Sequence, residues 1–434
     1  MIEPAERTAS ARRVLGPVDA TLVTVGAMVG SGIFATPSSV ARDAGSLGAA
    51  LAVWIAGAVL SLLGALAVAE PGAALPERGG LTAILRRAFG ARTAFAFGWT
   101  MTLVLVPSSV AFFAGVTAQH LAAVTGRSVP ALQSLVIVAV AGVNLLGIVP
   151  AARLQSGVTA LRVAALAAVA VAALALPPGV APAATTTTTP TFAGLFAALV
   201  AVLWSYDGWI DVTSLAAEVR EPGRTLPRAL VAGVGVVAAL YLLVVVAFHR
   251  ALSTAGLAAS AAPAAALGAR LAGVAGARVL VALVALSTFG GCLIGLVSGT
   301  RVVAAVADDA ARLAPLGRTD RRGVPAVATV VTVALALGYA RVRWFGELAQ
   351  VFVVGAWPFY ALGALAALRL RRREPGLARP FRTPGHPWTE RAFLVVTLAM
   401  MAGFARENGR ATLLSLAVVG AGITVFPALR GRAG

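Results

Sequence analysis

A cluster of glycines lies in the middle of an apolar run of membrane-spanning length near the N-terminus. Residues 25–34 read VGAMVGSGIF, with Gly26, Gly30 and Gly32 around Ser31. Glycine destabilises a helix by about 1 kcal/mol relative to alanine, and backbone groups freed in hydrocarbon need new partners. The cluster therefore indicates an unwound segment lining a cavity, where free N–H groups suit a carboxylate and free carbonyls suit an ammonium. The alternative is a helix contact made of small residues.

A second apolar run, 195–217, is interrupted by the sequence WSYDGW, which begins at Trp204 and places Asp207 near the middle of the run. An acid at this depth faces a partner or an aqueous cavity. Three roles for Asp207 stay open: a counter-charge for cationic substrates, a carboxylate that binds backbone amides freed by the break, or a proton-coupling site. An aromatic belt at the membrane interface is the structural alternative for the whole segment.

The elements that must position these residues are membrane helices. The chain is 59% hydrophobic and 12% charged, with a mean hydropathy of +0.89, which is outside the range of soluble domains. A spanning helix needs about 20 apolar residues. We predict an all-α polytopic membrane protein with twelve transmembrane helices, at 18–40, 47–69, 94–118, 131–150, 154–176, 193–217, 229–248, 278–299, 325–340, 345–368, 391–405 and 411–428.

The net charge of +18 comes from 35 basic residues, all of them arginine. In a soluble chain this excess would suggest nucleic acid, but here most arginines fall in loops on one side of the predicted membrane. The positive-inside rule then places both termini in the cytoplasm of a multi-pass protein of the cytoplasmic membrane, with arginines near anionic lipid headgroups. We expect no nucleic-acid partner, and the polar start of the chain is predicted to be a cytoplasmic leader.

Residues for other chemistries are sparse. Cys292 is the single cysteine, which excludes an intrachain disulfide. The three histidines are scattered, without a second ligand at a useful spacing, so no metal site is predicted. No nucleophile–base pair is recognisable at membrane depth, and we expect neither catalytic residues nor a cofactor. The chain is therefore predicted not to be an enzyme.

Several motifs, taken in order, resemble the amino acid–polyamine–organocation superfamily, and more narrowly its L-type amino acid transporter branch and bacterial amino acid permeases. The motifs are GSGIF at 30–34, AEPG at 69–72 with PERGG at 76–80, WSYDGW at 204–209, EVREP at 218–222 with LPRA at 226–229, STFG at 287–290, and PGLARPF at 375–381. The resemblance covers nearly the whole chain.

The resemblance implies a LeuT-like fold, a 5+5 inverted repeat with discontinuous helices 1 and 6. The predicted parts are a cytoplasmic leader (1–17), a first repeat of helices 1–5 (18–176), an external Pro/Thr linker (177–192), a second repeat of helices 6–10 (193–368), a basic cytoplasmic loop (369–390), helices 11–12 (391–428) and a cytoplasmic tail (429–434). It also implies secondary active transport of amino acids by alternating access, through exchange or proton symport. Neutral amino acids are favoured, cationic amino acids or polyamines at Asp207 are the alternative, and a sensor or channel is another class.

The predicted substrate-binding residues come from both interrupted helices and from helix 8. They are Ala27, Met28, Gly30, Ser31, Gly32, Ile33, Trp204, Ser205, Tyr206, Asp207 and Ser287. The resemblance implies that Trp204 closes over the substrate as a gate. Tyr206 is as readily a packing residue, and the two serines can also be ordinary helix contacts.

Three residues are candidates for coupling: Arg162, Asp207 and Glu70. In the family the position of Arg162 often carries a lysine, whose ammonium stands where sodium binds in sodium-coupled relatives. Arginine keeps the charge but does not release its proton, so coupling to sodium is not expected. The alternatives are that Arg162 reaches the cytoplasmic interface and that Glu70 pairs with a neighbouring cytoplasmic arginine.

The predicted outer loop between helices 3 and 4 contains no cysteine. Animal members of the branch attach a partner glycoprotein there. We therefore expect the chain to work without a disulfide-linked heavy subunit.

Overall fold

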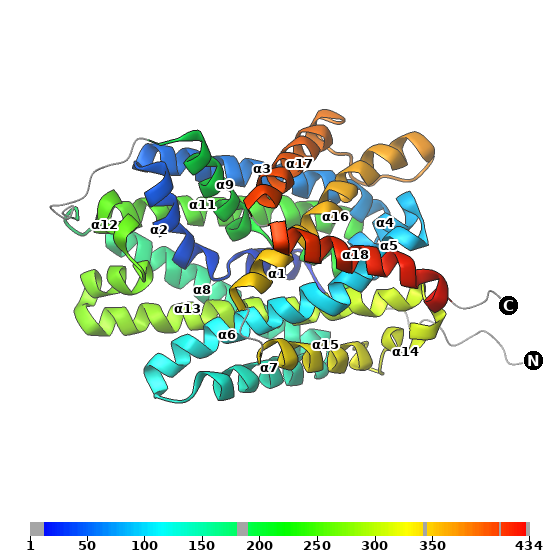
Figure 1. Ribbon diagram of the computed structural model, residues 1–434, viewed down its shortest axis with the longest axis horizontal. Helices are drawn as coiled ribbons and strands as arrows, with labels where there is room; N and C mark the ends of the chain where they lie inside the picture. Colours follow the sequence, from blue (N-terminus) through cyan, green and yellow to red (C-terminus); the bar gives the residue numbers. More distant parts are fainter. Residues whose placement is uncertain (1–12, 180–189, 342–344, 408, 431–434) are drawn as a thin grey trace, which may run out of the picture.

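The computed structural model describes residues 13–179, 190–341, 345–407 and 409–430, and these ranges are helical almost throughout (Figure 1). Within them the only extended pairing is an isolated bridge between Leu15 and Val219. The greater part of the predicted leader (1–17), linker (177–192) and tail (429–434) lies outside the described residues.

The helices of the first half correspond in order to the predicted spans 1–5, with one additional short helix. They are α1 (Pro17–Met28) with α2 (Gly32–Ala44), α3 (Leu47–Ala74), the short α4 (Leu81–Phe89), α5 (Ala91–Thr100) continuing through a π-helical turn (Met101–Leu105) into α6 (Val106–Thr125), α7 (Val129–Leu145) and α8 (Ile148–Leu174).

The helices of the rest of the chain correspond in order to the predicted spans 6–12, with two additional short helices. They are α9 (Phe192–Tyr206) with α10 (Asp211–Ser214), α11 (Pro222–Leu252), the short α12 (Thr254–Ala259), α13 (Pro263–Ala305), the short α14 (Ala314–Gly317), α15 (Ala326–Tyr339), α16 (Phe345–Arg373), α17 (Trp388–Glu407) and α18 (Gly409–Arg430).

Eight helical segments among the described residues are long and apolar enough to cross a membrane, and nine if the bent pair α1 and α2 is one span. This supports a polytopic membrane protein. Helices α7 and α15, with 17 and 14 residues, are apolar but shorter than a full span. The count of twelve therefore stays a prediction.

The two predicted interruptions are confirmed. Helix α1 ends at Met28 and α2 begins at Gly32, with a bend of 47° between them. Helix α9 ends at Tyr206, and helical structure resumes at Asp211. Both breaks fall on the glycine-containing motifs identified in the sequence.

Helix α13 is much longer than the predicted span 278–299, because it begins at Pro263 and ends at Ala305. Ala272 and Gly273 leave helical geometry, so this element is two helices joined by a kink. Arg270 and Arg278 interrupt the apolar pattern around the kink. A prediction from hydropathy alone therefore places the start of this helix at residue 278 instead of Pro263.

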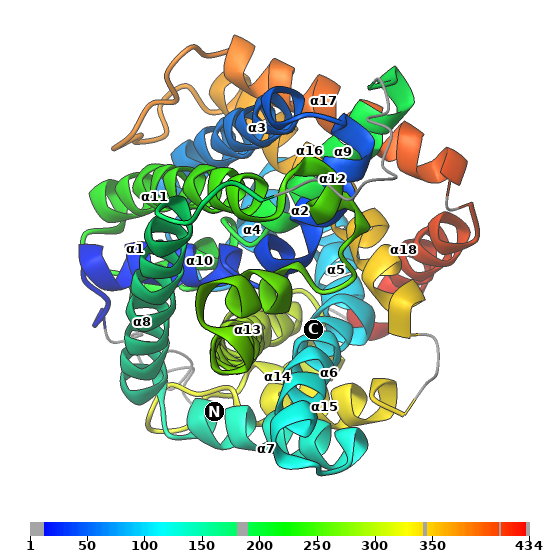
Figure 2. The ribbon, with the colours of Figure 1, turned by 90° about the vertical axis from the view of Figure 1, so that its left-hand side faces the viewer.

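Helix α13 lies near the centre of the bundle, where Figure 2 shows it almost end-on. It packs against α6, α8 and α1, while α11 packs against α3 and α1. The interrupted helices are therefore enclosed by long helices, which places both breaks inside the protein.

Ion pairs tie the short helix α4 to the ends of two long helices. Arg86 Nε lies 2.8 Å from Asp309 Oδ1, just beyond α13, and Arg87 Nη2 lies 2.8 Å from Glu374 Oε2, just beyond α16. The hydrogen bonds from Arg87 hold the pKa of the Glu374 carboxyl below its usual value. Helix α4 thus connects the two halves of the chain at this end of the molecule.

A third ion pair is buried. Arg301 Nε of α13 lies 3.2 Å from Glu218 Oε1, and the two side chains are 3% and 11% exposed. Arg301 also donates hydrogen bonds to the Val297 carbonyl (2.8 Å) and to Asn144 Oδ1 (3.4 Å). The pair links the segment after α10 to α13 and α7.

We predict that Arg301→Met lowers the apparent melting temperature of the purified protein, because it leaves the Glu218 carboxylate buried without its partner. Breaking such a pair costs about 3–5 kcal/mol. The matched control is Arg224→Met, whose pair with Glu221 is 75% and 76% exposed and should contribute less than about 1 kcal/mol. Equal melting temperatures for the two variants would contradict the prediction.

Candidate functional site

Both helix breaks open on one central cavity of about 600 Å³. Eight of the eleven predicted substrate-binding residues line it: Ala27, Met28, Gly30, Ser31, Gly32, Trp204, Ser205 and Asp207. Helices α6, α13 and α16 complete the wall with Ser109, Phe113, Gly291, Ile294, Gly295 and Tyr360. The fold therefore brings together two motifs that are far apart in the sequence.

The first turn of α2 presents backbone N–H groups at this cavity. The helix begins at Gly32, and the structure shows no acceptor within the described residues for the N–H groups of Ser31, Gly32 and Ile33. A helix N-terminus leaves such donors unpaired and carries a partial positive charge. This end of α2 can bind a carboxylate.

The carbonyl groups of the first break are bound by side chains from other helices. Tyr241 Oη donates to the carbonyl oxygens of Met28 (2.9 Å) and Ser205 (3.1 Å), one from each interrupted helix. Ser287 Oγ lies 3.1 Å from the Val29 carbonyl oxygen. The unwound backbone is therefore held in place by two hydroxyl groups.

Ile33, Tyr206 and Ser287 are the predicted substrate-binding residues that do not line the cavity. All three are buried. The Tyr206 ring lies 5.8 Å from Trp54 and 5.1 Å from Tyr241, measured between ring centroids. The packing role left open for Tyr206 agrees with this aromatic cluster, and Ser287 contacts backbone.

Trp204 lies in the last turn of α9, two residues before the helix ends at Tyr206. Its ring stands edge-on to Phe112 of α6, with centroids 6.2 Å apart. The residue also lines a separate apolar cavity on its other side. Its place between two cavities is compatible with the predicted gate.

Gly208 carries the sharpest turn of the second break, with φ at +104°. A side chain there would be strained in this backbone region and would also meet the Ala27 carbonyl at 2.6 Å. The glycine therefore allows the two breaks to touch.

The Gly208 backbone N–H and the Tyr360 hydroxyl are hydrogen-bond donors close to the Asp207 carboxyl. The nearness of the Gly208 N–H agrees with the role of binding amides freed by the break. Because Asp207 also lines the cavity, the geometry leaves it in reach of a bound solute.

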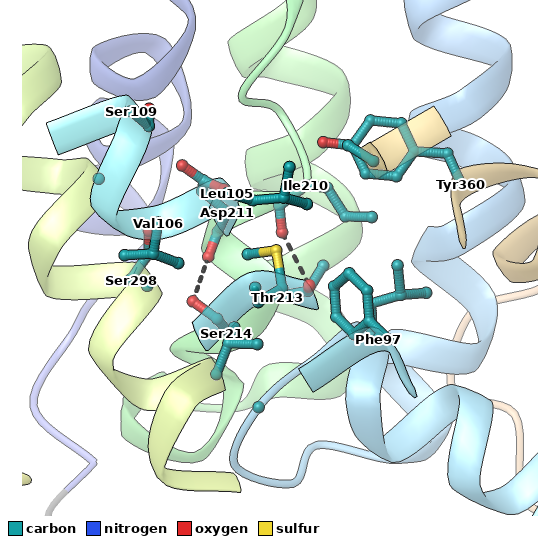
Figure 3. Close-up of a pocket in the computed structure, with 17 residues that line it drawn as sticks. Phe97, Leu105, Val106, Ser109, Ile210, Asp211, Thr213, Ser214, Ser298 and Tyr360 are labelled. Atoms are coloured by element: carbon teal, nitrogen blue, oxygen red, sulfur yellow. Dashed lines mark hydrogen bonds between the residues drawn. The ribbon is translucent and has the colours of Figure 1, made fainter. Parts of the chain in front are cut away.

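Asp211 is a second acid at the same break that the sequence analysis missed. It opens α10, lies close to the Ser298 hydroxyl and lines the central cavity. It also lines a neighbouring cavity of about 620 Å³, in which Figure 3 shows it near Ser109 and Tyr360. The sequence analysis could have identified Asp211 as a candidate site residue, because it is an acid only four residues after Asp207 in the same apolar run.

Three other residues that line the cavity, Ser109, Phe113 and Tyr360, could hardly be identified as site residues from the sequence. Ser109 and Phe113 lie on α6, just after the π-helical turn Met101–Leu105, and π-helical turns concentrate at functional sites. Tyr360 is one aromatic residue in a long apolar helix. Their positions depend on how α6 and α16 pack, which the sequence pattern does not specify.

Arg162 of α8 is fully buried. Its guanidinium donates to the Gly26 carbonyl of α1 and to the Ser287 carbonyl of α13, the latter at 2.9 Å. Because the side chain has no exposed surface, the alternative that it reaches the interface is wrong. It places a cation beside the first break.

Glu70 lies away from the central cavity. Its carboxylate binds Arg371 and lies 3.2 Å from Arg379 Nε, and it accepts a hydrogen bond from the Thr383 N–H (2.7 Å). The alternative of pairing with cytoplasmic arginines agrees with these contacts, which attach the loop after α16 to α3.

Comparison with known proteins identifies the family of the chain. The family model described as amino acid permease matches residues 15–426. The chain belongs to the amino acid permease family. The predicted resemblance is thereby confirmed.

Relatives within the amino acid permease family include transporters from animals and bacteria. The b(0,+)-type amino acid transporter 1 of Mus musculus is 28% identical over 87% of this chain and 80% of its own length. The serine/threonine exchanger SteT of Bacillus subtilis (strain 168) is 25% identical over 97% of this chain and 98% of its own. The large neutral amino acids transporter small subunit 2 of Homo sapiens is 27% identical over 86% and 72%.

We predict that Gly32→Ala abolishes amino acid uptake while the protein is still made and inserted. A Cβ atom at Gly32 would lie 2.8 Å from Ser205 Cα, so α2 and α9 would have to separate at the carboxylate-binding turn. Uptake of labelled amino acid, normalised to purified protein, measures this. Gly48→Ala is the control, because its Cβ meets open space, and full activity of Gly32→Ala would contradict the assignment of the turn.

We also predict that uptake does not change when sodium is replaced by choline. The permanent charge of Arg162 lies between the first break and α13, and a cation there opposes sodium binding. The measurement is uptake into proteoliposomes at matched ionic strength. A steep requirement for sodium would show that Arg162 does not play this part.

Proposed function

We propose that this permease exchanges amino acids across the membrane by alternating access, with neutral amino acids as its main substrates. The observation that carries the proposal is the central cavity lined by both broken helices, with unpaired N–H groups of α2 on one wall. The substrate carboxylate binds the N–H groups of Ser31 and Gly32, which line the cavity. Its ammonium faces the second break, near Asp207.

The cavity supports a small amphiphilic solute. Gly30, Gly32 and Gly291 add no side-chain bulk to its lining, while Phe113 and Ile294 give it apolar surface. Such a wall suits a neutral side chain, and the backbone contacts suit the α-amino and α-carboxyl groups that all amino acids share.

The proposal also includes the number of transmembrane spans and their arrangement in repeats. The spans number twelve, helices 1–5 and 6–10 form an inverted repeat, and helices 11 and 12 lie outside it. Two matching interruptions in the two halves support the repeat. The arginine-rich loops support cytoplasmic termini, with the external linker on the opposite side.

Exchange is favoured over ion coupling by the contacts of the three candidate residues. Arg162 supplies a fixed charge and binds two backbone carbonyls, Glu70 is held by two arginines, and Asp207 has the donors of Gly208 and Tyr360 close by. Each residue therefore has neighbours that suit a structural role. The name of the SteT relative, a serine/threonine exchanger, points the same way.

In this proposal the protein works without a disulfide-linked heavy subunit. Its one cysteine, Cys292, is buried on α13 with its thiol 3.6 Å from the Val110 carbonyl oxygen. A buried thiol cannot form a disulfide with a partner subunit without rearrangement of the helix packing.

A second candidate, transport of cationic amino acids, is favoured by the charges in the cavity. Asp207 and Asp211 both line it, and no arginine or histidine is among the described residues in its wall. Asp211 is the better placed to bind a distal cation, because it also borders the neighbouring cavity, where a longer side chain has room.

The test is counterflow into proteoliposomes. We expect labelled threonine to enter faster when unlabelled amino acids are inside, without any proton gradient. The expected stimulation is absent for a channel, and a sensor binds without moving the label. Uptake into empty vesicles driven by an inward proton gradient would instead establish symport and contradict exchange.

The same vesicles separate the two substrate classes when labelled arginine is compared with labelled threonine. If the distal cation binds at Asp211, Asp211→Asn reduces arginine exchange and spares threonine exchange. Glu221→Gln is the control, since that carboxylate is 76% exposed and outside the cavity. Absence of arginine exchange in the unmodified protein would reject the second candidate.

A further inference from the structure

An apolar cavity of about 940 Å³ lies between α9, α16, α17 and α18, and we name it the lateral cavity. Its wall is almost entirely hydrocarbon and aromatic rings, with Thr412 as the one hydroxyl-bearing residue among the described residues that line it. No charged side chain is among the described residues that line it. The lateral cavity is therefore unsuited to an amino acid's polar groups.

The lateral cavity meets the lipid-facing surface of the protein. Leu398 of α17 and Leu416 of α18 both line it and are 52% and 55% exposed. Their neighbours Val395 and Leu413 are 65% and 70% exposed on the same helices. In a multi-pass membrane protein this surface is bathed by hydrocarbon, so the mouth of the cavity is continuous with the membrane interior.

Trp204 separates the lateral cavity from the central cavity. It is the one residue shared between the two sets of lining residues, as far as the described chain extends. Whatever occupies the lateral cavity therefore packs against the back of the residue that faces the substrate space.

We propose that the lateral cavity holds an acyl chain of a membrane lipid, which packs against Trp204. Unfilled apolar space forfeits dispersion contacts, and a cavity wall costs stability in proportion to the volume left empty. Hydrocarbon is the available filler at this surface, and a flexible chain can enter between α17 and α18. The proposal does not depend on which amino acid the permease carries.

The first experiment measures tryptophan fluorescence in proteoliposomes of phosphatidylcholine with brominated acyl chains, against the same lipid without bromine. Bromine quenches tryptophan on contact. We expect more quenching in the unmodified protein than in Trp204→Phe. Trp388, which is 70% exposed, contributes to both and cancels in the comparison.

A matched pair of variants places the occupant in the lateral cavity. Ala405 lines the cavity, whereas Ala399 lies exposed on the same helix outside its lining. We expect Ala405→Phe to remove the Trp204-dependent quenching, because the ring takes the space of the lipid chain. Ala399→Phe should keep it, with each variant measured with and without Trp204→Phe.

Equal quenching in the unmodified protein and in Trp204→Phe would overturn the proposal, and so would persistence of the quenching in Ala405→Phe. The first comparison decides the question even if Ala405→Phe does not fold. If the cavity instead receives bulky substrate side chains, no Trp204-dependent lipid quenching occurs, and Ala405→Phe slows exchange of large apolar amino acids selectively. That outcome would also reject the lipid assignment.

Discussion

At bilayer depth a backbone N–H or C=O group that leaves a helix has no water to bind. Much of this structure serves to give such groups hydrogen-bond partners. Two interrupted helices free such groups side by side. The surrounding long helices supply the partners: Tyr241 of α11, Arg162 of α8 and Ser287 of α13 all bind carbonyl oxygens at the breaks. The N–H groups at the start of α2 are left over, and in the proposed function these bind the carboxylate of the substrate.

The breaks were predictable because glycine and acid residues are unfavourable in a spanning helix and therefore conspicuous. Gly30, Gly32 and Asp207 indicated the cavity before any coordinate was known. The kinked start of α13 was not predictable from hydropathy, since Arg270 and Arg278 make it resemble a loop. Tyr360 could not be assigned, because it joins Asp207 in the cavity wall only through the packing of α16 against the break.

Asp211 was missed in the sequence analysis for a different reason. Its position four residues after Asp207 was visible, but the predicted helix continued through it to residue 217, where an acid would face one side of a regular helix. In the structure a new helix starts at Asp211 itself, and a carboxylate is favourable at such a start. The placement of the second break, rather than the residue type, decides that both acids face the same space.

The Tyr241 hydroxyl has a consequence for motion. A phenol carries one hydrogen, yet this oxygen lies 2.9 Å from the Met28 carbonyl and 3.1 Å from the Ser205 carbonyl. Only one of the two bonds can be at full strength at any moment, so the proton is divided between the first and the second interrupted helix. If one helix draws away, the hydrogen turns wholly to the other and little enthalpy is lost. Tyr241 can therefore stay hydrogen-bonded to one interrupted helix while the other moves, so it holds the two breaks next to each other without fixing the distance between them.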